Sequence, residues 1–350
     1  MKVLVIQIKM IGDVLASTVI CEAIKKQHPN CEVHYLIQKN TFPVIENNPF
    51  IDKVLFFEEE KYKGLSGLFR LGIELKLEKY DTVIDVYGKF QSLIPTYLSG
   101  AKKRIGTYKW YSKLFLTETV IPDTECNGTA NAFRILLAKT AIKKEIPQIF
   151  PKIHLTPSEI ENAKNQIISQ LDVTKKIVMI SVLGSGKNKS LPDASMATVL
   201  NKIAATVDVQ LVFNYMPNQQ EEAKAIFDLC DANAQSKIIF DFYVKGLRGF
   251  LAVLSQCDAL VGNEGGATNM SKALNIPTFT IYAPWINRTS WNIFEETGLH
   301  EIVHLSDYFP DLYKNKHPKN FKEKALEWYD KLNPELFTEK LQRFVKKISQ

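Results

Sequence analysis

The chain has 350 residues, more than one typical hydrophobic core accommodates, so we expect two domains. Hydrophobic residues make up 45% of it and charged residues 23%, as in soluble globular proteins, and no apolar run approaches the ~20 residues that cross a bilayer. A net charge of +6 is too mild for a nucleic-acid-binding protein. It would suit contact with an anionic surface or with phosphorylated substrates, although an ordinary basic protein has the same balance.

The cysteines argue against a zinc site and against a disulfide framework. They are odd in number, scattered and without a CxxC pair: Cys21, Cys31, Cys126, Cys230 and Cys257. Such a pattern favours a reducing compartment, so we expect a cytoplasmic protein. The N-terminus, MKVLVIQIKMIGDV, lacks a signal-peptide cleavage site and is predicted to be the first strand of the fold.

The first half of the chain alternates β-branched runs with helical periods, which predicts a parallel sheet covered by helices on both faces. The predicted strands are residues 3–8, 33–37, 53–57 and 82–87. The predicted helices are residues 13–27, 42–48, 67–79 and 90–100.

Three prolines in KKEIPQIFPKIHLTP, residues 143–157, indicate a linker, after which the same alternation restarts. Its predicted strands are residues 176–183, 210–215, 237–242, 259–263 and 277–283, with helices between them and one or two terminal helices. We therefore predict an α/β protein with two Rossmann-like parallel-sheet domains, residues 1–155 and 156–320, facing each other across a cleft, and C-terminal helices over residues 321–350. Ligands of such sheets bind outside the carboxyl ends of the strands.

Two turns of the first domain could carry chemistry. In KMIGDV, Gly12 permits a tight turn, and Asp13 is either the N-cap of the next helix or a general base at the edge of the cleft. In DVYGKFQS, Gly88 allows close approach, and Lys89 and Gln91 could point into the cleft. The later segment AKKRIGTYKWYSK could contact an anionic acceptor or a membrane, or be a solvated loop.

In the second domain, GSGKNKS follows a predicted strand. Its spacing does not fit a Walker A loop, and no GxGxxG follows a strand. A loop of small residues with Lys187 and Lys189 near a helix start nevertheless suits a phosphate. Further on, Glu221 and Glu222 open a helix, where they either favour the helix dipole or accept hydrogen bonds from ribose hydroxyls.

The stretch VGNEGGATNM places two glycines at a strand-to-helix turn. The N–H groups from Gly265 to Thr268 would form an anion-binding nest suited to a diphosphate. Glu264 would repel that anion if it pointed inward, but it could cap the helix or meet the hydroxyls of an attached sugar. A nucleotide diphosphate sugar therefore suits both features.

These motifs, in this order, resemble glycosyltransferase family 9, the heptosyltransferases of lipopolysaccharide core assembly. The matching elements are IGD at 11–13, KRIG at 103–106, KSLP at 189–192 and NEGG…N…KALxxP at 263–277. The resemblance implies a GT-B fold, with an acceptor-binding N-terminal domain, a nucleotide-sugar-binding C-terminal domain and a terminal helix that returns to the first domain. It also implies an inverting reaction without a metal or a cofactor, and the chain contains no DxD pair.

By the same resemblance, Asp13 is the base that deprotonates the acceptor, and Lys189 contacts the donor phosphates as a second catalytic residue. Glu264 stands where the family has Asp. We expect the donor site to contain Ser185, Lys187, Lys189, Glu221, Glu222, Glu264, Gly265, Gly266, Ala267, Thr268 and Asn269. We expect the acceptor site to contain Lys9, Gly12, Lys89 and Arg104.

Several residues depart from the family pattern and leave the donor sugar open. Gln7 replaces an Arg, Asn269 replaces a His, and Leu191 replaces the Trp of KxWP. ADP-heptose is the family default, and the acceptor is a lipid-linked core oligosaccharide at the cytoplasmic face of the inner membrane. The basic tail LQRFVKKI could touch that membrane, although packing on the N-terminal domain is the favoured alternative. A catalytically silent nucleotide-sugar-binding protein and a GT-B sugar-nucleotide epimerase are the other functions compatible with these residues.

Overall fold

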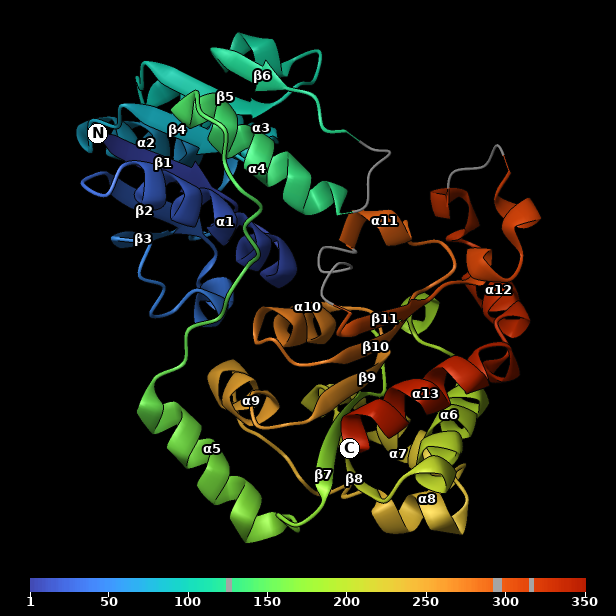
Figure 1. Cartoon of the computed structure of the whole chain (residues 1–350). Helices are drawn as coiled ribbons and strands as arrows, with labels where there is room; N and C mark the ends of the chain where they lie inside the picture. Colours follow the sequence, from blue (N-terminus) through green and yellow to red (C-terminus); the bar gives the residue numbers. More distant parts are fainter. Residues whose placement is uncertain (124–127, 292–297, 315–317) are drawn as a thin grey trace. The chain divides into compact units, whose positions relative to one another are not determined.

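The computed structural model describes residues 1–123, 128–291, 298–314 and 318–350 (Figure 1). Contacts within the chain divide it into two compact units, which begin at Met1 and at Leu155 and are hereafter unit 1 and unit 2. Thr289, in the short helix α11 (Arg288–Trp291), groups with unit 1, where its carbonyl oxygen accepts a hydrogen bond from the Gly128 N–H at 2.6 Å.

Unit 1 is built on a six-stranded sheet in the order β3-β2-β1-β4-β5-β6, and all of its strand pairs are parallel. The strands are β1 (Lys2–Ile6), β2 (Glu32–Ile37), β3 (Lys53–Phe56), β4 (Thr82–Asp85), β5 (Lys103–Thr107) and β6 (Glu118–Val120). The helices are α1 (Ile11–Gln27), α2 (Gly64–Leu77), α3 (Phe90–Leu98) and α4 (Thr129–Ile142). Neighbours α1 and α4 cover one face of the sheet, and neighbours α2 and α3 cover the other (Figure 1).

Two details of unit 1 differ from the sequence-based prediction. The segment predicted as a helix at 42–48 is instead the short 3-10 helix η1 (Lys39–Val44), which contains Pro43, a residue that disfavours a longer α-helix. The segment around 103–120, for which no strand was predicted, supplies β5 and β6 and a 3-10 turn, η2 (Ser112–Leu114).

Unit 2 has a second parallel sheet, in the order β11-β10-β9-β7-β8. Its strands are β7 (Lys176–Ser181), β8 (Val209–Asn214), β9 (Ala259–Asn263), β10 (Thr278–Ile281) and β11 (His300–Val303). Its helices are α5 (Pro157–Gln170), α6 (Asp193–Thr206), α7 (Gln220–Asp228), α8 (Ala232–Lys237), α9 (Leu247–Leu254), α10 (Gly266–Ala273), α12 (Ala325–Lys331) and α13 (Thr338–Ser349). The two parallel-sheet α/β units confirm the predicted fold class.

The strand predicted at 237–242 is wrong. Only a single bridge joins Ile238 to Leu211 of β8. The segment then leaves the sheet, and the ring of Phe240 packs against Tyr215 and Phe227 at centroid distances of 5.7 and 5.5 Å. Its apolar residues are therefore buried by ring packing instead of by strand pairing.

The terminal helix packs within unit 2, contrary to the expectation that it returns to the N-terminal domain. The apolar side of α13 is buried at Leu341, Phe344 and Val345, and the Phe344 ring lies 5.6 Å from that of Phe279 in β10. The apolar side of this tail is thus occupied by the sheet of its own unit.

The described part of the chain contains no helix that is both long and apolar enough to span a bilayer. Four cysteines, Cys21, Cys31, Cys230 and Cys257, are buried free thiols, and Cys126 lies outside the described residues.

Candidate functional site

The carboxyl ends of β7 and β9 bring together two residues that the sequence predicted for the donor site. These strands pair side by side, and Lys189 lies at the end of the 3-10 helix η3 (Lys187–Lys189) that follows β7. The Nζ atom of Lys189 lies 3.2 Å from Oε1 of Glu264, which follows β9. The Glu264 side chain is only 11% exposed and that of Lys189 28%. The pair is therefore a partly buried charge pair at the sheet edge where ligands of such folds bind.

Asn263 holds the two loops in this arrangement, a role that the sequence analysis missed. It is fully buried, and its Oδ1 accepts a hydrogen bond from the Leu191 N–H at 2.7 Å. Its Nδ2 donates to the carbonyl oxygen of Val182 at 2.9 Å. One amide side chain thus fixes both ends of the loop that carries Lys189.

Trp285 forms one wall beside the ion pair and was also missed. Its Nε1 donates to the carbonyl oxygen of Asn188 at 2.6 Å, and Lys189 Nζ lies 5.5 Å from its ring centroid. Lys322 Nζ lies 5.4 Å from the same ring. Aromatic rings stabilise cations at this range, so Trp285 holds the Lys189 ammonium in place.

The helix that follows Glu264 offers its N-terminus, as predicted. Helix α10 begins at Gly266, and its first N–H groups have no carbonyl in a preceding helical turn to donate to. A Cβ atom built on Gly265 would meet nothing within 4 Å, so this stretch of backbone is open on that side. Ala267 and Thr268 are buried, and Asn269 is half-buried. The backbone from Gly265 onward can therefore accept an anion.

The other predicted donor residues lie on two neighbouring loops. Ser185 and Lys187 are exposed in the loop after β7. Glu221 and Glu222 are exposed in the first turn of α7, after the adjacent strand β8. The structure brings neither of these acids into contact with the Lys189–Glu264 pair.

In unit 1, Asp13 is held by a buried arginine. The helix begins at Ile11, so Asp13 is its third residue, and Met10 occupies the N-cap position that was considered for Asp13. Arg134 of α4 is 4% exposed and donates from Nη2 to Oδ1 of Asp13 at 2.9 Å and from Nε to Ser17 Oγ at 2.8 Å. The Asp13 side chain remains 33% exposed, which leaves the carboxylate fixed in orientation but accessible.

No local pattern pointed to this role for Arg134, because it lies 121 residues from Asp13 in the sequence, in an apolar helix. Among the predicted acceptor residues, Lys9 forms an ion pair with Glu59 at 3.2 Å. Gly12 lies in the first turn of α1 beside Asp13. Lys89 is exposed at the N-cap of α3.

Arg104 has a different environment from the one expected of an acceptor ligand. Its guanidinium donates to the carbonyl oxygens of Ala101 at 2.6 Å and Phe115 at 2.8 Å and lies 5.5 Å from the Tyr97 ring. These contacts fix the segment that links β5 and β6, so Arg104 supports the fold of unit 1.

Asp85, at the carboxyl end of β4, is a titratable residue that the sequence analysis did not single out. It is fully buried, and its Oδ1 accepts a hydrogen bond from the Gly88 N–H at 2.8 Å. Burial raises the pKa of this carboxyl to about 6. It therefore positions the turn that carries Lys89.

Comparison with known proteins decides the family. The family model for glycosyltransferase family 9 (heptosyltransferase) matches residues 68–290, more than half of the chain. The chain belongs to glycosyltransferase family 9. It is therefore a glycosyltransferase of the heptosyltransferase family.

Relatives of this family 9 enzyme extend over nearly the whole chain. Lipopolysaccharide heptosyltransferase 1 of Campylobacter coli is 23% identical over 291 residues, which are 81% of this chain and 84% of the relative. The crystal structure of a family 9 glycosyl transferase from Veillonella parvula DSM 2008 superposes with a TM-score of 0.75 at 17% identity, covering 97% of each chain. The E. coli ADP-heptose lps heptosyltransferase II superposes with a TM-score of 0.73 at 17% identity, covering 99% of each chain. These similarities confirm the GT-B fold.

The departures from the family pattern have different surroundings in this family 9 enzyme. Leu191 is fully buried in the core of unit 2, where an apolar side chain is needed. Gln7 is 4% exposed at the end of β1, and its Oε1 has no hydrogen-bond partner among the described residues. The described part of the chain contains no cluster of three His, Cys, Asp or Glu side chains that could hold a metal ion.

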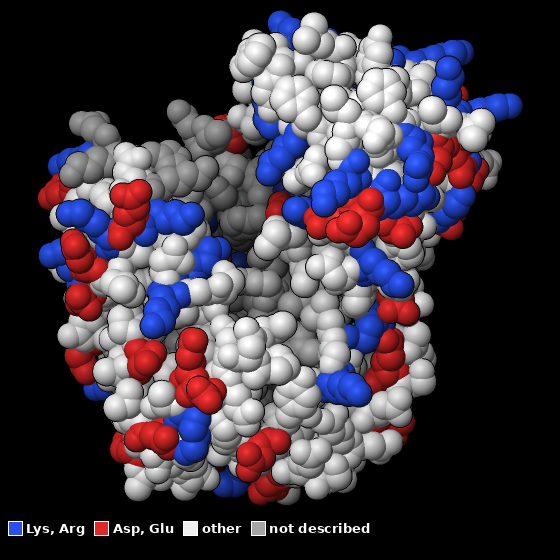
Figure 2. Space-filling view, turned by 180° about the vertical axis from the view of Figure 1, so that it is seen from behind, with Lys and Arg blue, Asp and Glu red and all other residues white. Residues whose placement is uncertain are grey.

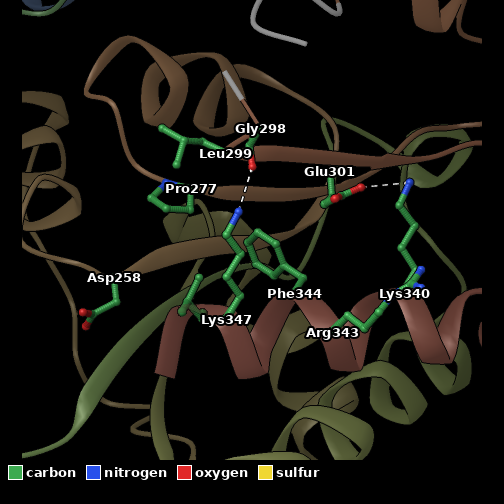
Figure 3. Close-up of a pocket in the computed structure, with 10 residues that line it drawn as sticks. Asp258, Pro277, Gly298, Leu299, Glu301, Lys340, Arg343, Phe344 and Lys347 are labelled. Atoms are coloured by element: carbon green, nitrogen blue, oxygen red, sulfur yellow. Dashed lines mark hydrogen bonds and ion pairs between the residues drawn. The ribbon is translucent and has the colours of Figure 1, made fainter. Parts of the chain in front are cut away.

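A pocket of about 460 Å³ lies in unit 2 at the opposite edge of the sheet (Figure 3). It contains none of the predicted site residues and is lined by Pro277 and Leu299, which precede β10 and β11, and by α13. Figure 3 shows Lys340 reaching Glu301, at 3.1 Å, and Lys347 reaching the Gly298 carbonyl oxygen, also at 3.1 Å. Because Lys340 and Lys347 already have partners within the protein, we assign the ligand site to the carboxyl ends of the strands and not to this pocket.

Proposed function

We propose that this family 9 enzyme transfers a sugar from a nucleotide diphosphate donor to a lipopolysaccharide core or related surface-glycan acceptor, with inversion and without a metal. ADP-heptose is the first donor to consider, because relatives are named as heptosyltransferases and one is named for ADP-heptose. The observation that carries the proposal is the Lys189–Glu264 pair beside the N-terminus of α10.

The donor diphosphate would lie between the Lys189 ammonium and the open N–H groups from Gly265 to Thr268. Both features favour negative charge, and both strengthen as the leaving diphosphate gains charge in the transition state. Glu264 would exchange its contact with Lys189 for the hydroxyls of the transferred sugar. Ser185 and Lys187 would contact the phosphates from the loop after β7, with Glu221 or Glu222 on the ribose and Asn269 beside the sugar.

Asp13 is proposed as the general base. Its carboxylate would take the proton of the acceptor hydroxyl while that oxygen attacks the anomeric carbon, and the bond from that carbon to the diphosphate breaks. Attack from the side opposite the leaving group inverts the configuration. Arg134 would keep the Asp13 carboxylate in one orientation, and Lys9, Gly12 and Lys89 would contact the acceptor.

The acceptor in this proposal is lipid-linked. The enzyme would therefore work in the cytoplasm, in peripheral contact with the cytoplasmic face of the inner membrane.

Calorimetric titration of the purified chain with ADP, GDP, UDP and CMP, without metal, tests the donor site. We expect selective ADP binding, weakened roughly tenfold to a hundredfold by Lys189→Ala, since hydrogen bonds to charged groups contribute that much. Lys164→Ala, an exposed lysine of α5, is the matched control. Selective binding of another nucleotide would overturn the heptose donor, and binding of none would overturn the donor site.

A transfer assay tests the base. We expect Asp13→Asn to slow transfer by roughly 10²- to 10⁴-fold, the usual contribution of a general base, and to leave ADP affinity unchanged. Glu60→Gln, an exposed acid of unit 1, is the control. Equal transfer by the parent and Asp13→Asn would refute the assignment.

A further inference from the structure

Helix α2 of unit 1 carries an apolar stripe on its outer side. Leu65, Phe69, Ile73 and Leu77 follow one another at intervals of four residues and so lie along one side of the helix. Their exposed fractions are 67%, 50%, 58% and 76%. The opposite side of α2 is buried in the core of unit 1. A helix that is apolar on both sides is normally covered on both, so the outer side of α2 calls for a partner.

The stripe continues over the neighbouring helix. A Cβ atom on Gly72 of α2 would lie 2.5 Å from that of Leu98 in α3, so only glycine allows the two helices to approach this closely. Both helices cover the same face of the sheet, and their outer sides therefore point away from it together (Figure 1). On α3, Phe90 and Tyr97 are 51% and 52% exposed.

The loop between β5 and β6 extends the same surface. The Tyr111 ring stacks on that of Phe90 at 4.9 Å, and the Phe115 ring lies 6.2 Å from that of Tyr97. This packing leaves Trp110 outermost, with 81% of its surface exposed. The outer sides of α2 and α3 and residues 108–115 thus form one surface, hereafter the apolar face. Monomeric proteins seldom expose so many large apolar side chains together.

The positive charge of the chain is concentrated on the elements that carry the apolar face. Residues 61–115 contain 11 of the 44 Lys and Arg residues and 4 of the 38 Asp and Glu residues, a net charge of +7. The other 295 residues therefore carry a net charge of −1. Of those four acids, Asp85 is fully buried, and Glu74 and Glu78 form ion pairs.

Exposed cations border the apolar face. Seven exposed cations among residues 61–115 form no ion pair within the described parts of the chain: Lys63, Arg70, Lys76, Lys79, Lys89, Lys102 and Lys113. Figure 2 views unit 1 from the side of α2 and α3, and there a broad white area has Lys and Arg side chains along its margins, with Asp and Glu side chains among them at the lower margin. The border is thus free to pair with negative charges outside the protein.

We infer that the apolar face and its cationic border are the surface through which this enzyme binds an anionic lipid bilayer. Leu, Ile and Phe side chains would enter the acyl boundary, Trp and Tyr rings would lie at headgroup depth, and Lys and Arg would contact anionic headgroups. The inference rests on the proposed function for its purpose, access to a lipid-linked acceptor, but its test needs no substrate.

Charge distinguishes a bilayer from the other occupants. A second copy docked face to face would bring two cationic borders together, which is unfavourable. A soluble oligosaccharide would leave the aliphatic stripe of α2 in water along roughly 18 Å of helix, given a rise of 1.5 Å per residue. An anionic bilayer satisfies both the stripe and the border.

Sedimentation of the 350-residue chain with lipid vesicles tests the inference. We expect binding to phosphatidylethanolamine vesicles that contain phosphatidylglycerol, much weaker binding to phosphatidylcholine vesicles, and a decrease with added salt. The double variant Phe69→Glu/Ile73→Glu should bind roughly tenfold or more weakly, since it removes two large apolar groups from the contact. Ile168→Glu/Val173→Glu in unit 2, where the two side chains are 62% and 60% exposed, is the matched control and should bind as the parent does.

Two results would overturn the inference: no vesicle binding by the parent, or equal weakening by both double variants. If vesicle binding is absent and the parent forms a dimer that Phe69→Glu/Ile73→Glu dissociates, the apolar face is a contact between copies of the chain. Titration with ADP separates this surface from the proposed function. Both double variants should bind ADP as the parent does, which also shows that they fold. Vesicle binding without any nucleotide binding would refute the donor site and leave the membrane surface standing.

Discussion

The buried lysine of α10 gives the sharpest test of the packing in unit 2. Lys272 is 2% exposed, and its Nζ atom has no hydrogen-bond partner among the described residues. Burial lowers the pKa of this ammonium to about 8 from 10.5. Burial of His300 itself, and then the nearby charge of Lys272, lower the pKa of His300 to about 4. Lys272 is therefore a desolvated charge at neutral pH, and we expect Lys272→Met to stabilise the protein.

The magnitude follows from the difference between the two pKa values. A shift from 10.5 to about 8 corresponds to roughly 3 kcal/mol, at 1.36 kcal/mol per pKa unit. Below pH 8 both the folded and the unfolded states hold the proton, and the full cost is present. Between pH 8 and 10.5 the folded state releases the proton first, so the unfolded state binds more protons and the free energy of unfolding rises with pH. At pH 7, Lys272→Met should gain about 2–3 kcal/mol.

Urea unfolding of the parent and Lys272→Met at intervals from pH 7 to 10.5 measures this gain. The difference between the two proteins should shrink as pH rises, because the parent loses its penalty and the variant has none to lose. Taking the difference cancels tyrosine and cysteine titrations that both proteins share. Lys164→Met, at an exposed position of α5, should change little at any pH. A destabilised Lys272→Met would show that the ammonium has a stabilising partner. A gain that does not depend on pH would show that it does not come from removing a desolvated charge.

Three further predictions concern the site and its supports. The pKa of the Asp85 carboxyl is about 6 in the folded state and 3.8 ordinarily, so the folded state binds this proton more tightly than the unfolded state does. The free energy of unfolding should therefore fall by roughly 3 kcal/mol between pH 4 and 6. Asp85→Asn should flatten that fall, as measured by urea unfolding. Gly262→Ala should unfold at a much lower urea concentration than the parent. The φ of Gly262 is +134°, and a Cβ there would lie 2.4 Å from the carbonyl oxygen of Ser181 in the neighbouring strand. Gly265→Ala is the control: a Cβ at Gly265 has open space, so this variant should keep parental stability. Glu264→Gln should bind ADP severalfold more tightly by calorimetry, since it frees Lys189 from its ion pair; weaker binding would show that the carboxylate itself contacts the nucleotide.

Periodicity predicted most of the fold because most strands and helices have strong local patterns. Helix α2 is an example, because its buried residues Leu68, Leu71 and Leu75 recur at helical spacing. The failures occurred where tertiary contacts decide. The 237–242 run has strand composition, yet its Phe240 ring finds aromatic partners and leaves the sheet. The amphipathic tail was correctly predicted as a helix, but amphipathicity does not specify which sheet covers its apolar side.

The parts of the candidate site that have a local sequence signal could be predicted. The parts that depend on contacts between residues far apart in the sequence could not. Glycines beside a helix start, and Lys189 near another, are local signals. Arg134 has no such signal, because its partner Asp13 is 121 residues away in the sequence. Asn263 was included in a matching motif, but its structural role was not predicted. Its side-chain amide bonds the backbone at Leu191 and Val182, and strands β7 and β9 bring these groups together only in the folded sheet.

The distribution of charge implies that the two binding tasks respond differently to salt. Outside residues 61–115 the chain carries a net charge of −1, so attraction of a diphosphate to unit 2 depends on a local arrangement, Lys189 and the first turn of α10, held in partly buried surroundings. Buried pairs are screened much less than exposed charges. The border of the apolar face is exposed and acts through its summed charge, so salt should weaken it strongly. Vesicle binding that falls with salt while ADP binding hardly changes would therefore locate the two functions in different parts of the chain; a parallel loss of both would mean that the donor, too, is held by long-range charge.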